Sequence, residues 1–228
     1  MQNLALSKIL QNKQEKNSEN GINIRERSEV IIMIIWINGA FGSGKTQSAY
    51  ELHRRIPNSF IYDPENIGLF IRKNIPKQLN SGDFQNYTMW REFNYSMLKY
   101  IANKYKGTII VPMTISNPQY FNEIVLQLRN DGFLINHFVL CASKETLLKR
   151  LRCRGDGKNS WAAQQIDSCI NGFNNEKFKQ HIDTENLSIR GVVEKIALLS
   201  NINLLPDNRS KIRRVYDRIK TQLKNVRL

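Results

Sequence analysis

Residues 39–46 form a glycine-rich segment that ends in a lysine and a hydroxyl residue. The segment has the spacing G-x-x-x-x-G-K-[ST], in which backbone N–H groups surround an anion and the lysine adds positive charge. Within it, Lys45 is placed to reach the β- and γ-phosphates of ATP, and Thr46 to offer its hydroxyl to Mg²⁺. The expected ATP-binding residues are Gly39, Ala40, Phe41, Gly42, Ser43, Gly44, Lys45 and Thr46.

A nucleotide site does not specify a reaction, so nearby acids matter. The predicted strand that ends at Val111–Thr114 carries no carboxylate, which argues against a motor or switch ATPase. Asp63, at the end of the predicted strand 59–64, is the best-placed acid to orient an attacking hydroxyl or accept its proton. The pair Asp63-Pro64 is also typical of a turn, and Glu65 is a second choice.

Three arginines end a predicted helix just before a glycine loop. Arg150 and Arg154 share a helical face and are candidate catalytic groups, and Arg152 is a candidate nucleotide contact. Such a run is similar to the lid of small P-loop kinases, where arginines stabilise the transferring phosphoryl group. The alternative is a solvated basic face at a helix C-terminus. Arg72 and Arg91 could bind an acceptor, although a surface position is commoner for each.

Strand-like apolar runs alternate with helical patterns along the chain. Strands are expected at 30–37, 59–64, 108–115, 133–142 and 181–183, and helices near 45–55, within 83–105, and near 118–130, 144–154, 161–170, 188–199 and 208–225. This alternation predicts an α/β, three-layer P-loop NTPase/kinase-like fold with a five-stranded, mostly parallel sheet and helices on both faces. Trp90, Phe93 and Tyr95 could stack on a flat acceptor, but core packing explains Trp90 and Phe93 at least as well.

Composition limits the possible classes of protein. The 228 residues suit one α/β domain, and the longest apolar run, 30–37, is too short to span a bilayer and is not followed by a cleavage site. The three cysteines and three histidines lack metal-ligand spacing, so we expect no zinc site and a cytoplasmic location.

The net charge of +14 implies an anionic partner, and much of the excess lies between 208 and 228. Apolar residues recur there at helical spacing: Ile212, Val215, Tyr216, Ile219, Leu223 and Val226. Either an interfacial helix on a membrane surface or a terminal helix packed on the domain fits this pattern. Nucleic-acid binding is not expected, because no recognition module accompanies the charge. We therefore divide the chain into a disordered extension (1–32), a P-loop kinase-like domain (33–206, lid about 150–163) and a basic amphipathic helix (207–228).

Several stretches together carry a family resemblance: MIIWINGAFGSGKTQ, YDPENIG, MWREFNYSML, VPMTI, ASKETLLKRLR and GKNSWAAQQID. From about Met33 to its C-terminus the chain resembles the tunicamycin resistance protein family. The resemblance implies a P-loop kinase-like fold, ATP binding at 39–46, Asp63 facing the acceptor, and Arg150 to Arg154 in a lid. It also implies resistance to tunicamycin through phosphorylation of the drug, and peripheral attachment to the inner face of the membrane through the C-terminal helix.

Three functions therefore stay open. The first is an ATP- and Mg²⁺-dependent phosphotransferase that acts on a small tunicamycin-like nucleoside. The second is an ATP-binding peripheral membrane protein that sequesters the drug without chemistry. The third is a cellular nucleoside or nucleotide kinase.

Overall fold

The computed structural model of the chain describes residues 32–225. The expected disorder of the N-terminal extension therefore falls, except for residue 32, outside the described residues. The elements, in chain order, are β1 (Met33–Gly39), α2 (Lys45–Arg55), β2 (Ser59–Ile61), α3 (Glu65–Asn74), η1 (Lys77–Leu79), η2 (Phe84–Asn86), α4 (Thr88–Lys104), β3 (Thr108–Pro112), α5 (Pro118–Phe121), η3 (Asn122–Leu126), α6 (Gln127–Asn130), β4 (Leu134–Cys141), α7 (Lys144–Cys153), α8 (Trp161–Gln164), α9 (Ile166–Phe173), β5 (His181–Asp183), α10 (Ile189–Leu199) and α11 (Lys211–Lys224).

The five strands form one sheet in the order β2-β3-β1-β4-β5, and every neighbouring pair is parallel. The predicted α/β fold with a five-stranded sheet is confirmed, and the sheet is parallel throughout. β1 lies in the centre because its side chains are apolar on both faces, as a strand covered on both sides requires.

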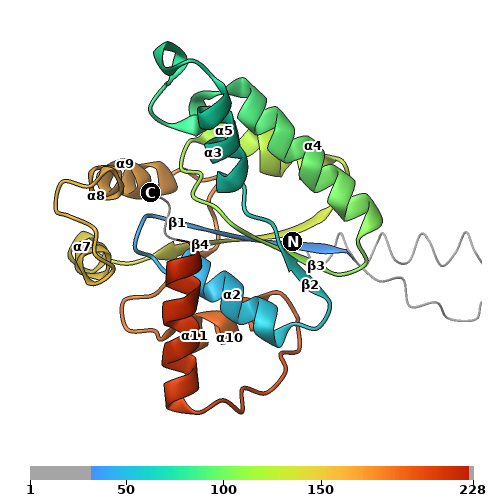
Figure 1. Cartoon of the computed structure of the whole chain (residues 1–228). Coiled ribbons are helices and arrows are strands. Elements are labelled where there is room, and N and C mark those ends of the chain that lie inside the picture. Colours follow the sequence, from blue (N-terminus) through green and yellow to red (C-terminus); the bar gives the residue numbers. More distant parts are fainter. Residues whose placement is uncertain (1–31, 226–228) are drawn as a thin grey trace, which may run out of the picture. The chain divides into compact units, whose positions relative to one another are not determined.

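Alternate residues of the strands enter two separate cores. Ile34 and Trp36 pack with helices α3 to α6 and α9, whereas Ile35 and Ile37 pack with α2 and α10. Figure 1 shows these two helical layers on opposite sides of the sheet. The helix that follows β1 and the helix that follows β3 therefore cover opposite faces. Between two adjacent strands with that arrangement, a crevice opens at their carboxyl ends, and open α/β sheets bind ligands in such crevices.

Some elements differ from the sequence prediction. Helix α3 was not predicted; its ten residues follow Pro64 and include Gly68. Residues 118–130 form the expected helix, with a π-helical turn in its middle. The strand expected at 59–64 ends at Ile61, and Asp63 belongs to the turn that leads into α3.

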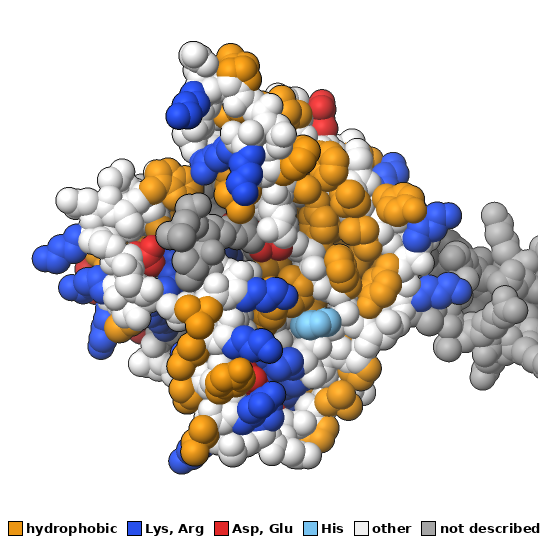
Figure 2. All heavy atoms as spheres, viewed as in Figure 1, with side chains coloured by type: hydrophobic (Ala, Val, Ile, Leu, Met, Phe, Trp, Pro, Cys, Tyr) orange, Lys and Arg blue, Asp and Glu red, His pale blue; other side chains and the backbone are white. Residues whose placement is uncertain are grey.

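Helix α11 turns its apolar side chains away from the domain. Ile212 and Leu223 are 82% and 69% exposed, and Val215, Tyr216 and Ile219 are also exposed. These side chains form a ridge on the molecular surface, beside lysine and arginine side chains (Figure 2). Within residues 32–225 no helix combines the length and the apolar character needed to cross a bilayer.

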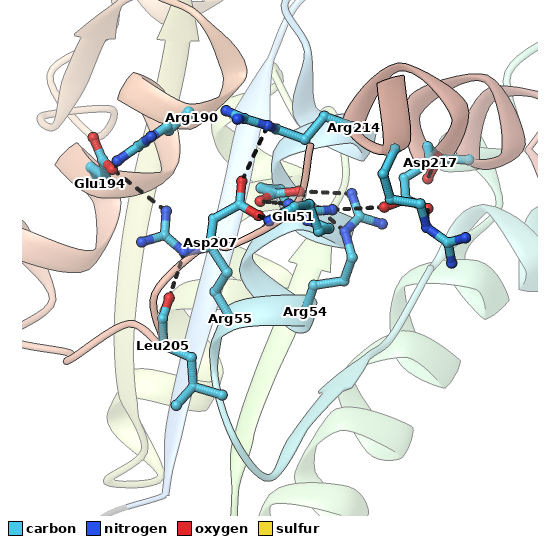
Figure 3. A network of polar contacts seen from close by, with 12 residues as sticks. Glu51, Arg54, Arg55, Arg190, Glu194, Leu205, Asp207, Arg214 and Asp217 are labelled. Carbon is cyan, nitrogen blue, oxygen red and sulfur yellow. Dashed lines mark hydrogen bonds and ion pairs between the residues drawn. The ribbon is translucent and has the colours of Figure 1, made fainter. Parts of the chain in front are cut away.

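The opposite, polar face of α11 holds the helix against α2. Arg209, just before α11, forms ion pairs with Glu51 of α2, with Asp207 at 2.6 Å and with Asp217 of α11 at 2.8 Å. Figure 3 shows this network where α2, α10 and α11 meet. Gln47 Nε2 also donates to the Arg218 carbonyl at 3.0 Å. The helix thus packs on the domain, which was one of the two interpretations of its sequence. It does so through charged residues and not through its apolar residues.

Candidate functional site

The loop between β1 and α2 adopts a conformation that needs its glycines. Gly39, Gly42 and Gly44 have φ values of 139°, 84° and 97°, which L side chains rarely adopt. A Cβ on Gly39 or Gly42 would also lie 2.5 or 2.7 Å from a backbone carbonyl oxygen. The chain therefore turns tightly at the carboxyl end of β1, with little room for side chains.

The N-terminus of α2 opens onto this loop. Gly44 occupies the cap position, no side chain caps the helix, and its first turn contains no acid. The Ser43 hydroxyl is buried and has no hydrogen-bond partner among the described residues. Helix N-termini of this kind bind anions through their free N–H groups and the positive end of the helix dipole. The loop fits the phosphates of a nucleotide.

Lys45 lies across the loop. Its Nζ donates to the carbonyl oxygens of Gly39 at 2.8 Å and Ala40 at 3.1 Å, and it lies 5.4 Å from the centre of the Phe41 ring. Burial lowers the pKa of Lys45 from 10.5 to about 8; the charges of Glu65 and Cys169 act against this shift. A positive charge with little hydration is therefore held where phosphates would bind.

The loop is anchored by a buried asparagine that was not predicted. Asn38 Oδ1 accepts from the N–H of Gly39 and of Ile115, both at 2.9 Å, and its Nδ2 donates to the Ile115 carbonyl at 2.8 Å. The buried Thr114 hydroxyl donates to the Gly39 carbonyl at 2.9 Å. These bonds join the start of the loop to the segment after β3. Asn38 interrupts an apolar run just before the loop, which is a signal that the sequence does contain.

Asp63 and Glu65 lie at the N-terminal end of α3. Asp63 Oδ1 accepts from the Glu65 N–H at 3.0 Å, which fixes the orientation of that carboxylate. The Trp90 indole donates to the Pro64 carbonyl at 3.0 Å and holds the turn on α4. The charge of Glu65, the second choice from the sequence, acts to raise the pKa of Lys45 against the effect of burial.

The three arginines of α7 have different surroundings. Arg150 donates to the Thr184 hydroxyl at 3.0 Å and to the Thr184 carbonyl at 2.6 Å, which ties α7 to the residues after β5. Arg152 is exposed, and its Nε lies 3.4 Å from the Leu148 carbonyl. Arg154 forms an ion pair with Asp156 at 2.7 Å, and its charge acts on Lys45. Of the three, Arg154 is the one whose charge reaches the loop.

An aromatic contact joins the loop to the segment after the arginines. The rings of Phe41 and Trp161 meet edge to face, with centroids 5.1 Å apart. Trp161 is the first residue of α8 and is 43% exposed. The segment predicted to be a lid therefore contacts the loop through an aromatic pair as well as through the charge of Arg154.

The expected acceptor-binding side chains do not line a common wall. Trp90 is fully buried, so core packing is the correct interpretation for it, whereas Phe93 is 45% exposed. Tyr95 donates to Asp131 at 2.7 Å. Arg91 is buried and ion-paired with Glu123, so the expected surface position is wrong for it.

Metal-binding side chains are sparse. Residues 32–225 contain no group of three histidine, cysteine or acidic side chains able to hold a metal ion. The chain after β3 brings Thr114, and no carboxylate, to the loop. Thr46, the residue expected to bind Mg²⁺, is half-buried in the first turn of α2.

Comparisons with known proteins agree with this geometry. The AAA domain family matches residues 34–173, which implies nucleotide binding. The tunicamycin resistance protein of Deinococcus radiodurans is 36% identical, with a TM-score of 0.66, and the match covers 76% of this chain and 98% of that one. A Janibacter sp. HTCC2649 sugar kinase and the Bacteroides thetaiotaomicron shikimate kinase, 16% and 15% identical, share the fold, with TM-scores of 0.52; they match 75% of this chain and 94% and 99% of theirs. A search of curated proteins finds no match.

Proposed function

The chain belongs to the AAA domain family and to the tunicamycin resistance protein family of P-loop kinase-like proteins, and we propose that it transfers the γ-phosphoryl group of ATP to a hydroxyl of a tunicamycin-like nucleoside. One observation carries the proposal: the loop is bordered by Lys45 and by the acidic turn that begins α3. A protein that only binds a nucleotide would not need an oriented carboxylate, such as that of Asp63, in the turn before α3.

Nucleotide binding would use the loop as a preformed cradle. The N–H groups of the loop and of the first turn of α2 would bind phosphate oxygens, and Lys45 would exchange its two carbonyl contacts for the β- and γ-phosphates. Thr46 would hold Mg²⁺ together with phosphates and water. When bound, Mg²⁺ neutralises charge that develops on the transferring group.

The acceptor would lie between the loop and the turn at the start of α3. Its hydroxyl oxygen forms a bond to the γ-phosphorus, the bond from that phosphorus to the bridging oxygen of ADP breaks, and Asp63 receives the hydroxyl proton. The hydrogen bond from the Glu65 N–H supports this role, because it fixes the Asp63 carboxylate in the turn between β2 and α3. Correct positioning of this kind supplies most of the catalysis in phosphoryl transfer.

The lid residues would close the site. Arg154 is the proposed charge-stabilising group, because its charge already acts on Lys45. Arg152, which is exposed, is the proposed nucleotide contact. Arg150 would keep α7 in place through its bonds to Thr184, and we do not assign it a contact with the phosphoryl group.

One experiment distinguishes the proposed phosphotransferase from the two other candidate functions, drug sequestration and a cellular nucleoside or nucleotide kinase. Purified protein is incubated with Mg²⁺-ATP and tunicamycin, and the drug is examined by mass spectrometry. A transferase yields drug heavier by one phosphoryl group, whereas a sequestering protein binds the drug unchanged. A cellular nucleoside or nucleotide kinase leaves tunicamycin unchanged and phosphorylates a nucleoside or nucleotide. Unmodified drug, at demonstrated ATP binding, refutes the proposal.

Asp63→Asn separates chemistry from binding. We expect turnover to fall by roughly 10² to 10⁴, the usual range for loss of a general base, while the affinity for ATP is kept. Glu65→Gln is the matched variant, since it removes a neighbouring carboxylate and leaves the proposed base in place. Equal turnover in Asp63→Asn and the wild type would exclude the assigned role.

We also propose that α11 attaches the protein to the inner face of the membrane. The exposed apolar ridge supports this, and so does its charge: α11 has six basic residues and one acid, and that acid, Asp217, is turned inward to Arg209. Basic and apolar residues side by side fit an anionic bilayer surface. Ile219→Ser with Leu223→Ser should reduce flotation with anionic vesicles, and unchanged flotation would refute the attachment.

A further inference from the structure

A second apolar surface lies along one flank of α4 and continues onto the edge strand β2. Its members are spaced four residues apart on the helix and are joined by one strand residue: Met89, Phe93, Met97, Ile101, Tyr105 and Phe60. The Tyr105 and Phe60 rings lie 6.1 Å apart, which connects helix and strand. This surface is named the α4 stripe.

The α4 stripe borders the core-facing side of its helix: Met97, Ile101 and Tyr105 are half-buried and pack against the core, whereas the remaining members are exposed. Trp90 and Leu98, on the neighbouring face, are fully buried against the sheet. In contrast, Met89 and Phe93 are 53% and 45% exposed, and Phe60 is 43% exposed. Figure 2 shows a continuous run of hydrophobic side chains along α4 toward β2. A connected apolar surface of this kind indicates an interaction site more often than isolated apolar residues do.

Positive charge lies at one end of the α4 stripe. Lys104 and Lys106 are exposed at its β2 end, and Glu92 is the one acid in the α4 sequence. The same view shows the apolar ridge of α11, with lysine and arginine side chains between the two apolar surfaces (Figure 2). Two apolar surfaces that face one way across a basic band suit a flat, anionic, apolar-cored partner. A lipid bilayer has those properties.

We propose that the α4 stripe is a second bilayer-contacting surface, which together with α11 docks this face of the protein on anionic lipid. The inference rests on the proposed attachment through α11 and extends it to residues about 120 positions earlier in the chain. One helix lying on a bilayer leaves the domain free to rotate about that helix. Two separate contacts fix the orientation of the domain, and their simultaneous engagement strengthens binding.

The test uses the full-length chain and sucrose-loaded vesicles of phosphatidylglycerol and phosphatidylethanolamine. The double variant Met89→Ser, Phe93→Ser removes two half-exposed apolar side chains outside the nucleotide site. Transfer of their remaining exposed area accounts for a fall in the vesicle partition coefficient on the order of tenfold. Leu198→Ser with Leu199→Ser is the matched control, because both leucines are exposed on α10, which belongs neither to the α4 stripe nor to α11. We expect the control to partition like the wild type.

Each outcome decides the proposal. Tenfold weaker partition of the α4 variant, with unchanged thermal unfolding and ATP affinity, supports it. Equal partition of variant and wild type overturns it, and leaves attachment through α11 standing if the α11 variant fails to float. Absence of wild-type partition overturns both membrane proposals. A wild-type dimer that the α4 variant converts to monomer assigns the stripe to a second copy of the chain and overturns the lipid proposal. The mass of the drug product, measured without vesicles, tests the phosphotransferase separately.

Discussion

The pH dependence of ATP binding provides a direct test of the role of Lys45. Burial lowers its pKa to about 8 in the protein without nucleotide. A bound triphosphate places negative charge beside the ammonium and raises that pKa. Above pH 8, binding must therefore take up a proton at Lys45, and the affinity for ATP falls as the pH rises.

The magnitude follows from the size of the pKa shift. Well above pH 8 and below the pKa of the complex, one proton is taken up per ATP bound, so the Kd rises about tenfold per pH unit, or about 1.4 kcal/mol. The stability of the free protein changes with pH in the opposite direction to the affinity for ATP. Between pH 8 and about 10.5 the unfolded lysine binds more protons than the folded one, so the contribution of Lys45 to stability increases with pH.

Isothermal titration calorimetry from about pH 7 to about pH 9.5, in buffers with different ionisation enthalpies, measures both the affinity and the proton uptake. Lys45→Arg is the control, because a guanidinium stays protonated throughout this range. We expect weaker but nearly pH-independent binding in that variant. A flat wild-type profile, or the same slope in the arginine variant, would show that the titrating group is not Lys45 and refute the reasoning.

Three further predictions concern the supports of the site. Gly42→Ala should destabilise the fold by about 2 kcal/mol or more in thermal unfolding, since φ is 84° and its Cβ would meet a backbone carbonyl at 2.7 Å; Gly155→Ala, with φ 97° in open space, should cost only about 1–2 kcal/mol. Asn38→Leu leaves two buried N–H groups without acceptors, which should cost about 2–5 kcal/mol in urea unfolding and weaken ATP binding. Arg209→Met should cost about 2 kcal/mol at neutral pH, since it removes charge-assisted hydrogen bonds from three acids of low exposure, each of which keeps one other arginine partner. In the wild type, the side-chain hydrogen bonds of Arg209 lower the pKa of Asp207 to about 2. The contribution of this ion pair to stability is therefore complete above about pH 4 and falls as the pH drops toward 2. This contribution should be smaller in the variant.

The sequence predicts the elements near the glycine loop well, because local rules determine them. Glycines before Lys45 and an apolar run ahead of them require a strand, a tight turn and a helix, and α2 begins and ends at the predicted residues. Helix α3 was missed, since its packing on α4 and η2, and not its propensity, stabilises it. Gly68 in α3 is needed because the Phe84 ring lies against it, a tertiary contact with no local signal.

The side-chain partners of the site could be predicted less well. Arg150 and Arg154 share one helical face, and spacing alone gave them the same role. In the structure their surroundings differ, because Arg150 donates hydrogen bonds to Thr184, which follows β5. Asn38 illustrates the converse. A polar residue in an apolar strand is visible in the sequence, but two of its backbone hydrogen bonds are made with Ile115, 77 residues away.

Helix α11 shows most clearly what periodicity leaves open. An amphipathic pattern identifies two faces, and burial of the apolar face is the usual result. In α11 the polar face is the one that packs, because Glu51 and Asp207 supply acids to Arg209, and Thr221 is the buried residue of the helix. Ion pairs hold α11 on the domain, so its exposed apolar residues gain no stabilisation by burial against the domain itself. We propose that a partner covers them, and the α4 stripe on the same face fits a partner that is broad and flat.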